Sequence, residues 1–172
     1  MTRRKFIANT TATALGAAAV QAGTKSARAA QMQSAKPQSK GGKRKVTAAA
    51  APKPAGPYSH AIVAGDMIYV AGQGPFNPET GKLVGPGIAE QTEQTLKNIK
   101  TILEAAGAGL SDVVKVSVYL ADLGDFAKMN EVYSRVFPEP FPARATIGAK
   151  LLLEMRIEVE CVAYKPAAQS KR

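Results

Sequence analysis

Two charged residues near the C-terminal end of the sequence have the chemistry to bind and hydrolyse a small carboxylic acid. Arg144 ends the segment F-P-A-R (141–144), and Glu158 lies in the run M-R-I-E-V-E-C-V-A-Y (155–164). A guanidinium can hold a carboxylate through two parallel hydrogen bonds, and a glutamate can orient and activate a water molecule. The pair therefore predicts a site for a small carboxylate. The alternative for Arg144 is a structural ion pair at a subunit interface.

The run 155–164 alternates between apolar and polar residues at a period of two, which predicts a strand with two unlike faces. The apolar face, which we expect in the core, consists of Ile157, Val159, Cys161 and Ala163. The opposite face consists of Arg156, Glu158, Glu160, Val162 and Tyr164. Charges in the middle of a strand require that their face meets water or a polar cavity, so a ligand can reach Glu158.

The single cysteine and the single histidine are both interpreted as residues without a chemical role. Because Cys161 is alone in the sequence, an intrachain disulfide and a cysteine-built zinc site are excluded. We expect Cys161 to be a small apolar core residue. His60 has no partner among the motifs, and we interpret it as an incidental loop residue. We therefore expect neither a metal nor histidine acid–base chemistry.

The elements that must position Arg144 and Glu158 begin near Ala61. Two short strands, at 61–63 and 67–71, flank a Gly-Asp turn. Apolar residues at intervals of three or four predict an amphipathic helix over 88–106 that stops at Gly107. A strand over 111–120 follows, with these residues expected inward: Val114, Val116, Val118 and Leu120.

A second helix is predicted to begin at Asp122 as N-cap and to end at three closely spaced prolines before Arg144. Its buried side is expected to consist of Phe126, Met129, Tyr133 and Phe137. The order of elements predicts an α+β fold, one sheet with two helices on one face. The other face keeps Tyr119, Val162 and Tyr164 among polar residues, so we expect subunits to pack sheet to sheet.

The positive charge of the chain is concentrated outside the predicted folded part. The 172 residues carry a net charge of +10. Residues 1–65 hold eleven Lys or Arg and no acidic residue, whereas residues 66–172 hold twelve basic and thirteen acidic residues. Because the folded part is nearly neutral, we expect no nucleic-acid partner, which would require a basic stripe on the domain itself.

The first 29 residues are typical of an export signal. The segment T-R-R-K-F-I (2–7) precedes a weakly apolar stretch and a small-residue site, A-R-A (27–29). Arg3 and Arg4 resemble the twin-arginine version of such a signal, which predicts an exported, periplasmic protein. The alternative is a basic N-terminus that only resembles a signal. No apolar run is long enough for a membrane span, so we expect no stable insertion after the signal is removed.

The residues between the signal and the folded part predict a disordered linker over 30–55. This stretch is rich in Ala, Pro, Lys, Ser and Gln and has almost no large apolar residue to bury. The cluster K-R-K (43–45) is interpreted as part of a solvated tail. The folded domain is expected over 56–166, and residues 167–172 form a C-terminal tail.

The order and spacing of eight short motifs resemble the reactive intermediate/imine deaminase family, also known as RidA or YjgF. The motifs are G-P-Y-S (56–59), V-A-G-Q (70–73), N-P-E-T-G (77–81), Q-T-E-Q-T-L-K-N-I (91–99), V-Y-L-A-D-L (118–123), F-A-K-M-N-E-V-Y (126–133), F-P-A-R (141–144) and I-E-V-E (157–160). The resemblance implies a chorismate-mutase-like homotrimer with three clefts, each lined by two chains. It also implies that no cofactor is needed.

The resemblance further implies an activity and the residues that perform it. The family hydrolyses reactive enamines and imines, of the 2-aminoacrylate and 2-iminobutanoate type, to 2-oxo acids and ammonia. Arg144 resembles the arginine that holds the substrate carboxylate, and Glu158 resembles the residue that helps hold the attacking water. An imine carbon is already electrophilic, so fixing its carboxylate beside an oriented water supplies much of the catalytic assistance.

Four further residues match substrate-binding positions of the family. Tyr58 resembles the aromatic residue at the cleft mouth, and Gly72 resembles the glycine that lets the backbone approach the ligand. Asn130 resembles the helix asparagine near the site, although a structural role is equally expected. Thr146 stands where many members have cysteine, and its family role is mainly through the backbone. Ala71 stands where many members have serine, so the expected substrate range is less defined than the reaction type.

Two other functions stay open at this point. One is a non-catalytic trimer that binds 2-oxo acids or similar small carboxylates. The other is an endoribonuclease or translation inhibitor, as reported for some relatives, which the near-neutral domain and the predicted export disfavour. Turnover of an imine discriminates the deaminase from the binding protein.

Overall fold

The computed structural model describes residues 42–166. The predicted export signal (1–29), the first part of the predicted linker (30–41) and the tail (167–172) lie outside the described residues. Between residues 42 and 166, no helix combines the length and apolar character that crossing a membrane requires.

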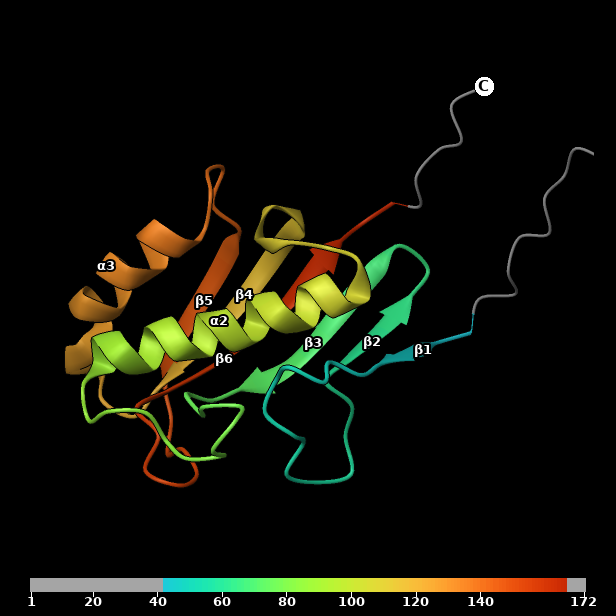
Figure 1. Cartoon of the computed structure of the whole chain (residues 1–172). Helices are drawn as coiled ribbons and strands as arrows, with labels where there is room; N and C mark the ends of the chain where they lie inside the picture. The colour runs from blue at the N-terminus through green and yellow to red at the C-terminus, as the bar shows by residue number, and fades with distance from the viewer. Residues whose placement is uncertain (1–41, 167–172) are drawn as a thin grey trace, which may run out of the picture. The chain divides into compact units, whose positions relative to one another are not determined.

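One six-stranded sheet forms the frame of the fold, with strand order β1-β2-β3-β6-β4-β5 (Figure 1). The strands are β1 (Arg44–Val46), β2 (Ala61–Ala64), β3 (Met67–Gln73), β4 (Val113–Leu120), β5 (Ala143–Gly148) and β6 (Ile157–Tyr164). Neighbouring strands are antiparallel except for β4 and β5, which are parallel. The chain between β4 and β5 must therefore cross back along the sheet, and this crossover contains the second helix.

Both long helices, α2 (Ile88–Ala106) and α3 (Phe126–Val136), lie on the same face of the sheet (Figure 1). Helix α2 ends where predicted, because Gly107 adopts a left-handed conformation with φ of 88° and caps the helix. Short 3₁₀ turns, η1 (Leu110–Asp112) and η2 (Leu123–Asp125), lead into β4 and α3. The prediction of an α+β fold with one sheet and two helices on one face is confirmed. The sheet face without a helix in residues 42–166 is named the open face below.

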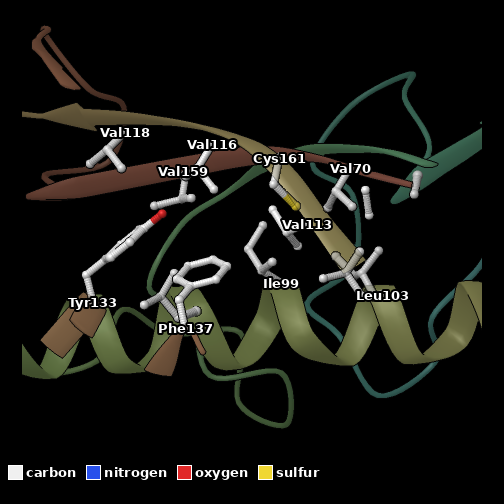
Figure 2. Packing of buried hydrophobic residues seen from close by; sticks show 14 of the residues in the cluster. Val70, Ile99, Leu103, Val113, Val116, Val118, Tyr133, Phe137, Val159 and Cys161 are labelled. Atoms are coloured by element: carbon white, nitrogen blue, oxygen red, sulfur yellow. The ribbon is translucent and has the colours of Figure 1, made fainter. Parts of the chain in front are cut away.

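The alternation predicted for residues 155–164 is confirmed in β6, the strand that joins β3 to β4 near the middle of the sheet. Its inward residues pack against α2 and the neighbouring strands, as Figure 2 shows for Val159 and Cys161. Cys161 is buried in this core, and burial together with the nearby Glu160 charge raises the pKa of its thiol to about 12. Cys161 is therefore the inert core residue that the sequence predicts.

The prediction of a disordered linker is wrong for its C-terminal part, because residues 44–55 belong to the folded unit. Strand β1 pairs with β2, and the core includes Val46, Ala48 and Ala51. The His60 ring is buried here, accepting the Ala48 N–H at Nδ1 (3.2 Å) and contacting the Pro52 carbonyl through Nε2 (2.9 Å). The interpretation of His60 as an incidental loop residue is also wrong, since it joins this segment to β2.

Strand β4 begins later than predicted and contains an irregularity that reverses one inward assignment. Its pairing with β6 shifts register between Val113 and Lys115. Val113 is consequently buried, and Val114, which we expected inward, is exposed. The extra residue of such a bulge displaces the alternation at that point. The remaining inward residues of β4 are buried as predicted.

Helix α3 also begins later than predicted. Asp122 caps the turn η2 rather than the helix, accepting the Gly124 N–H at 2.8 Å. Met129, Tyr133 and Phe137 are buried as expected. Phe126, the first residue of the helix, is exposed and not part of the core.

Candidate functional site

The two residues expected to act on one ligand lie on opposite faces of the sheet within one chain. In the parallel pairing of β4 and β5, Arg144 aligns with Val116, which is fully buried on the helix-covered face. Glu158 aligns with Tyr119 in the pairing of β4 and β6, so its side chain lies on the open face. A single chain therefore provides two separate groups of candidate site residues.

The first group lines a cleft of about 720 Å³ around Glu158. Its walls come from residues 52–60, from residues 71–81 and from the loop residues 152–155. Tyr58 lies at this cleft, and its hydroxyl accepts the Ala55 N–H at 2.9 Å, which holds the exposed ring in place. The structure thus brings together three of the predicted residues: Tyr58, Gly72 and Glu158.

Gly72 lies at an irregularity of β3 and directly beside Glu158. The register with β6 shifts between Val70 and Gln73, and the Gln73 amide donates to the carbonyls of Ala71 (3.1 Å) and Gly72 (3.0 Å). A Cβ atom at Gly72 would overlap the Glu158 carboxylate. The glycine is therefore required for the position of Glu158 itself.

The Glu158 carboxylate has a raised pKa, so it binds a proton more readily than an ordinary glutamate. Partial burial and then the Glu160 charge raise its pKa above the ordinary value. The Tyr119 hydroxyl donates to Glu160 Oε1 at 3.0 Å, which raises the pKa of Tyr119 as well. A carboxylate with a raised pKa in a cleft can take up and return a proton, as a general base must.

The second group surrounds Arg144 on the helix-covered face. The Arg144 Cζ atom lies 4.5 Å from the centre of the Tyr133 ring and 5.8 Å from that of the Phe126 ring. Asn130 lies between these two aromatic residues along α3, at helical spacings of four and three. Thr146, two residues after Arg144 on the same side of β5, has a buried hydroxyl without a hydrogen-bond partner. The structure thus brings Arg144, Asn130 and Thr146 to one region.

Tyr133 is the buried member of this second group. Burial raises its pKa to about 12, and the Arg144 charge opposes part of that shift. No carboxylate in residues 42–166 forms an ion pair with Arg144. Arg144 is therefore a positive charge supported by aromatic rings and available to an anion.

Two buried amide side chains of α2 bond to backbone outside the helix, Asn98 to residues that line the cleft, and sequence reasoning did not assign them a role. Gln91 donates to the Gly85 carbonyl (3.0 Å) and accepts the Arg156 N–H (2.8 Å). Asn98 donates to the carbonyls of Gly74 (3.1 Å) and Phe76 (2.9 Å). The signal for both was present, because amide residues on the apolar side of a predicted helix need buried partners.

Sequence reasoning also missed the apolar part of the cleft wall. Leu152, Leu153 and Met155 line it from the loop between β5 and β6, and Lys53 lines it from the segment expected to be a linker. Leu153 and Glu154 have positive φ values of 53° and 58°, which non-glycine residues rarely adopt. No periodic pattern could reveal a wall built by such a loop. In the described part of the chain, no three His, Cys, Asp or Glu side chains are grouped to hold a metal.

Comparisons with known proteins show which family the chain resembles. The family model described as Endoribonuclease L-PSP matches residues 48–165. A RutC family protein of Pyrococcus abyssi is 59% identical over 116 residues, covering 67% of this chain and 91% of the relative. The human 2-iminobutanoate/2-iminopropanoate deaminase is 44% identical over 124 residues, covering 72% of this chain and 90% of the relative.

Solved structures give the same result. RidA from an Antarctic Psychrobacter is 43% identical with a TM-score of 0.68, and the match covers 70% of this chain and 98% of that one. The YjgF protein of E. coli is 38% identical with a TM-score of 0.68, over the same shares of the two chains. The family match, the relatives and the shared fold together show that the chain belongs to the RidA/YjgF family, described as Endoribonuclease L-PSP.

Proposed function

We propose that this protein hydrolyses reactive 2-imino acids and their enamine forms to 2-oxo acids and ammonia, without a cofactor. The observation that carries the proposal is the Glu158 carboxylate, which is partly buried in the cleft and has a raised pKa. Relatives from human and from Dermatophagoides farinae, 44% and 40% identical, are named 2-iminobutanoate/2-iminopropanoate deaminase. A further relative, from Arabidopsis thaliana, is named Reactive Intermediate Deaminase A.

The proposed reaction needs two contributions from the protein. Arg144 binds the substrate carboxylate through its guanidinium and so fixes the imine carbon in place. Glu158 accepts a proton as the water oxygen bonds to that carbon, and then returns the proton to the nitrogen, which gives a carbinolamine. The carbinolamine hydroxyl proton then moves to the amine nitrogen, the carbon–nitrogen bond breaks, ammonia leaves, and the carbonyl of the 2-oxo acid forms.

We propose that two chains supply one site and that the assembly is a homotrimer. Arg144 and Glu158 lie on opposite faces of the sheet in one chain, so a site containing both draws on a second copy. The open face carries exposed apolar side chains, Tyr69, Ile147 and Tyr164, which packing between copies would bury. Sedimentation of residues 30–172 should give a trimer mass, and a stable monomer at micromolar concentration would contradict the shared site.

A small carboxylate is the ligand class that this proposal requires. The E. coli TdcF protein, 32% identical with a TM-score of 0.68, was solved with bound serine, which carries a carboxylate. The near neutrality of residues 66–172 gives the endoribonuclease alternative no matching electrostatic support.

The test generates 2-iminobutanoate with an amino-acid oxidase and follows its lifetime by semicarbazide trapping, with and without the protein. We expect the protein to shorten the imine lifetime and release ammonia. Titration with 2-oxobutanoate measures binding separately. Binding without any change in imine lifetime would contradict the deaminase and support the non-catalytic carboxylate-binding protein.

We also propose that residues 1–29 export the protein to the periplasm by the twin-arginine route. The support is the pair Arg3 and Arg4 before a weakly apolar stretch. Replacing both by lysine keeps the charge but removes the planar guanidinium groups, so we expect full-length protein to accumulate in the cytoplasm. Fractionation followed by mass spectrometry measures this. The control is replacement of Lys36 and Lys40, which lie outside the signal, and unchanged processing of the Arg3/Arg4 variant would contradict the proposal.

A further inference from the structure

Arg144 lies against two aromatic rings of the same helix. Its Cζ atom is 4.5 Å from the centre of the Tyr133 ring and 5.8 Å from that of the Phe126 ring. Phe126 and Tyr133 are separated by two helical turns on one side of α3. Both distances fall within the range in which a ring attracts a guanidinium cation.

This support differs from the way in which Arg156, also partly buried, is held. Arg156 uses Nε and one Nη atom to bind the two oxygens of Asp125, at 2.8 and 2.9 Å. A guanidinium held in this way has its charge neutralised and its fork of donors occupied. Ring faces support the Arg144 guanidinium instead, and no carboxylate in residues 42–166 pairs with it. Its fork therefore remains available to a ligand carboxylate.

Tyr133 is in turn fixed by the core. It is 5% exposed, and its ring centre lies 4.5 Å from that of Phe137 with the planes inclined by 32°. Figure 2 shows the ring extending from the helix layer toward the sheet beside Phe137. Because buried side chains keep one rotamer, the surface that Tyr133 presents to Arg144 is fixed before any ligand binds. The Arg144 Cζ atom lies 4.5 Å from the ring centre, and no hydrogen bond of good geometry reaches the Tyr133 hydroxyl.

We propose that the rings of Tyr133 and Phe126 form an aromatic support that positions the Arg144 guanidinium for the substrate carboxylate. Tyr133 is the main positioning residue, because it is closer and is fixed in the core. Phe126, which is exposed, supports the guanidinium from the outer side. The inference rests on the proposed function for its substrate, and it assigns roles to two residues that are not themselves substrate contacts.

Three variants test the role of the Tyr133 ring. Tyr133→Phe keeps the ring and removes the hydroxyl, so with the ring as the support its KM for 2-iminobutanoate should stay within about twofold of wild type. Tyr133→Leu removes the ring, and its KM and its Kd for 2-oxobutanoate should rise by about tenfold, with a smaller loss in kcat. The matched control is Phe137→Leu, which removes a buried ring that touches Tyr133 but not Arg144. It should lower stability and leave Kd nearly unchanged.

A second pair of variants separates the effect on Arg144 from general loss of aromatic surface. Phe126 is 44% exposed and Phe141 is 47% exposed, but only Phe126 contacts the Arg144 guanidinium. We expect Phe126→Leu to raise the Kd for 2-oxobutanoate by about threefold and Phe141→Leu to leave it unchanged. Equal effects of the two substitutions would show that the ring contact is not responsible.

A measurement without ligand keeps the inference testable even if the deaminase proposal fails. The proton on Arg144 Nε, identified by its loss in Arg144→Lys, should be shifted by the nearby rings in a ¹H–¹⁵N spectrum. The shift should persist in Tyr133→Phe and disappear in Tyr133→Leu. An unchanged Arg144 signal or an unchanged Kd in folded Tyr133→Leu overturns the aromatic support. A wild-type protein that binds 2-oxobutanoate but hydrolyses no imine overturns the proposed function alone.

Discussion

Glu158 owes its raised pKa to two neighbours of different kinds, the surrounding protein and the Glu160 carboxylate two residues along the same strand. A general base is active when deprotonated, so activity is lost as the pH falls through its pKa. In a plot of kcat/KM against pH, the loss of activity on the acid side should therefore occur at a higher pH than the usual pKa of a glutamate would give.

Glu160→Gln tests this dependence. Removing the negative charge lowers the pKa of Glu158, so the acid side of the kcat/KM profile should move to lower pH. The glutamine oxygen can still accept the Tyr119 hydroxyl, so the local structure is retained. Steady-state rates at a series of pH values measure the shift. The control is Glu104→Gln on the exposed side of α2, and an equal shift in both variants would contradict the assignment of Glu158 as base.

Arg144 should be the largest single contributor to carboxylate binding. Each charge-assisted hydrogen bond contributes about 1.5–3 kcal/mol. Loss of two such bonds in Arg144→Ala should lower kcat/KM at least about a hundredfold while the protein stays folded. Arg144→Lys should restore activity only in part, since an ammonium cannot form the paired contact. Activity of Arg144→Ala near the wild-type value would exclude this role.

The matched control for that series is Glu158→Gln, which keeps the shape of the side chain and removes its charge. Its kcat should fall, whereas its Kd for 2-oxobutanoate should change little. Arg144→Ala should show the opposite order of effects, with Kd most affected. Identical patterns in the two variants would mean that the two residues do not divide binding and proton transfer between them.

Among the elements, the loop between β5 and β6 is the one that we expect to influence substrate choice most. It contributes Leu152, Leu153 and Met155 to the cleft, and Leu153 is 71% exposed there. A substrate side chain that covers this exposed apolar wall removes apolar surface from water, which stabilises the bound state. We therefore expect the loop to favour imines with longer apolar side chains.

A series of imines made from alanine, 2-aminobutanoate, norvaline and norleucine measures this preference. The kcat/KM value should rise along the series by at most about fourfold per methylene, which corresponds to about 0.8 kcal/mol of burial. Leu153→Ser should flatten the series with little loss of stability, because the side chain is exposed. The control is Leu123→Ser, an exposed leucine outside the cleft. A series that stays steep in Leu153→Ser would exclude the loop as its cause.

The elements that could be predicted from the sequence are those with a regular period. Helix α2 and the faces of β6 follow from spacing alone, because burial repeats with the geometry of the element. The bulge near Val114 could not be predicted, because a single inserted residue produces no repeating pattern in the sequence. Strand β1 was missed because the residues that follow it are mostly alanines. Composition alone does not show whether such small residues are buried.

For the whole molecule, the main result is the separation of the candidate site into two groups. The sequence identified Arg144, Glu158, Tyr58, Gly72 and Thr146, and the structure assigns each to one of the two groups. Their division between faces depends on how β5 pairs with β4, and strand pairing is a long-range property that residue spacing does not encode.

Mixing two inactive proteins tests whether one site draws on two chains. We expect co-expressed Arg144→Ala and Glu158→Gln chains to regain activity, because some clefts would receive an intact Arg144 and an intact Glu158 from different copies. Random assembly of equal amounts into a trimer restores about one quarter of the clefts. Each variant expressed alone is the control. No recovery from mixed assemblies, confirmed by mass spectrometry, would show that both residues act within one chain.

The placement of Arg144 and Glu158 on opposite faces also has a consequence for how the rate depends on dilution. If the two residues serve one substrate, an isolated chain contains one half of each of two sites and no complete site. The rate would then rise more steeply than the protein concentration until assembly is complete, and only above that point become proportional to it. A newly synthesised chain would be inactive until it assembled with other copies. The reaction order in protein would therefore report assembly directly.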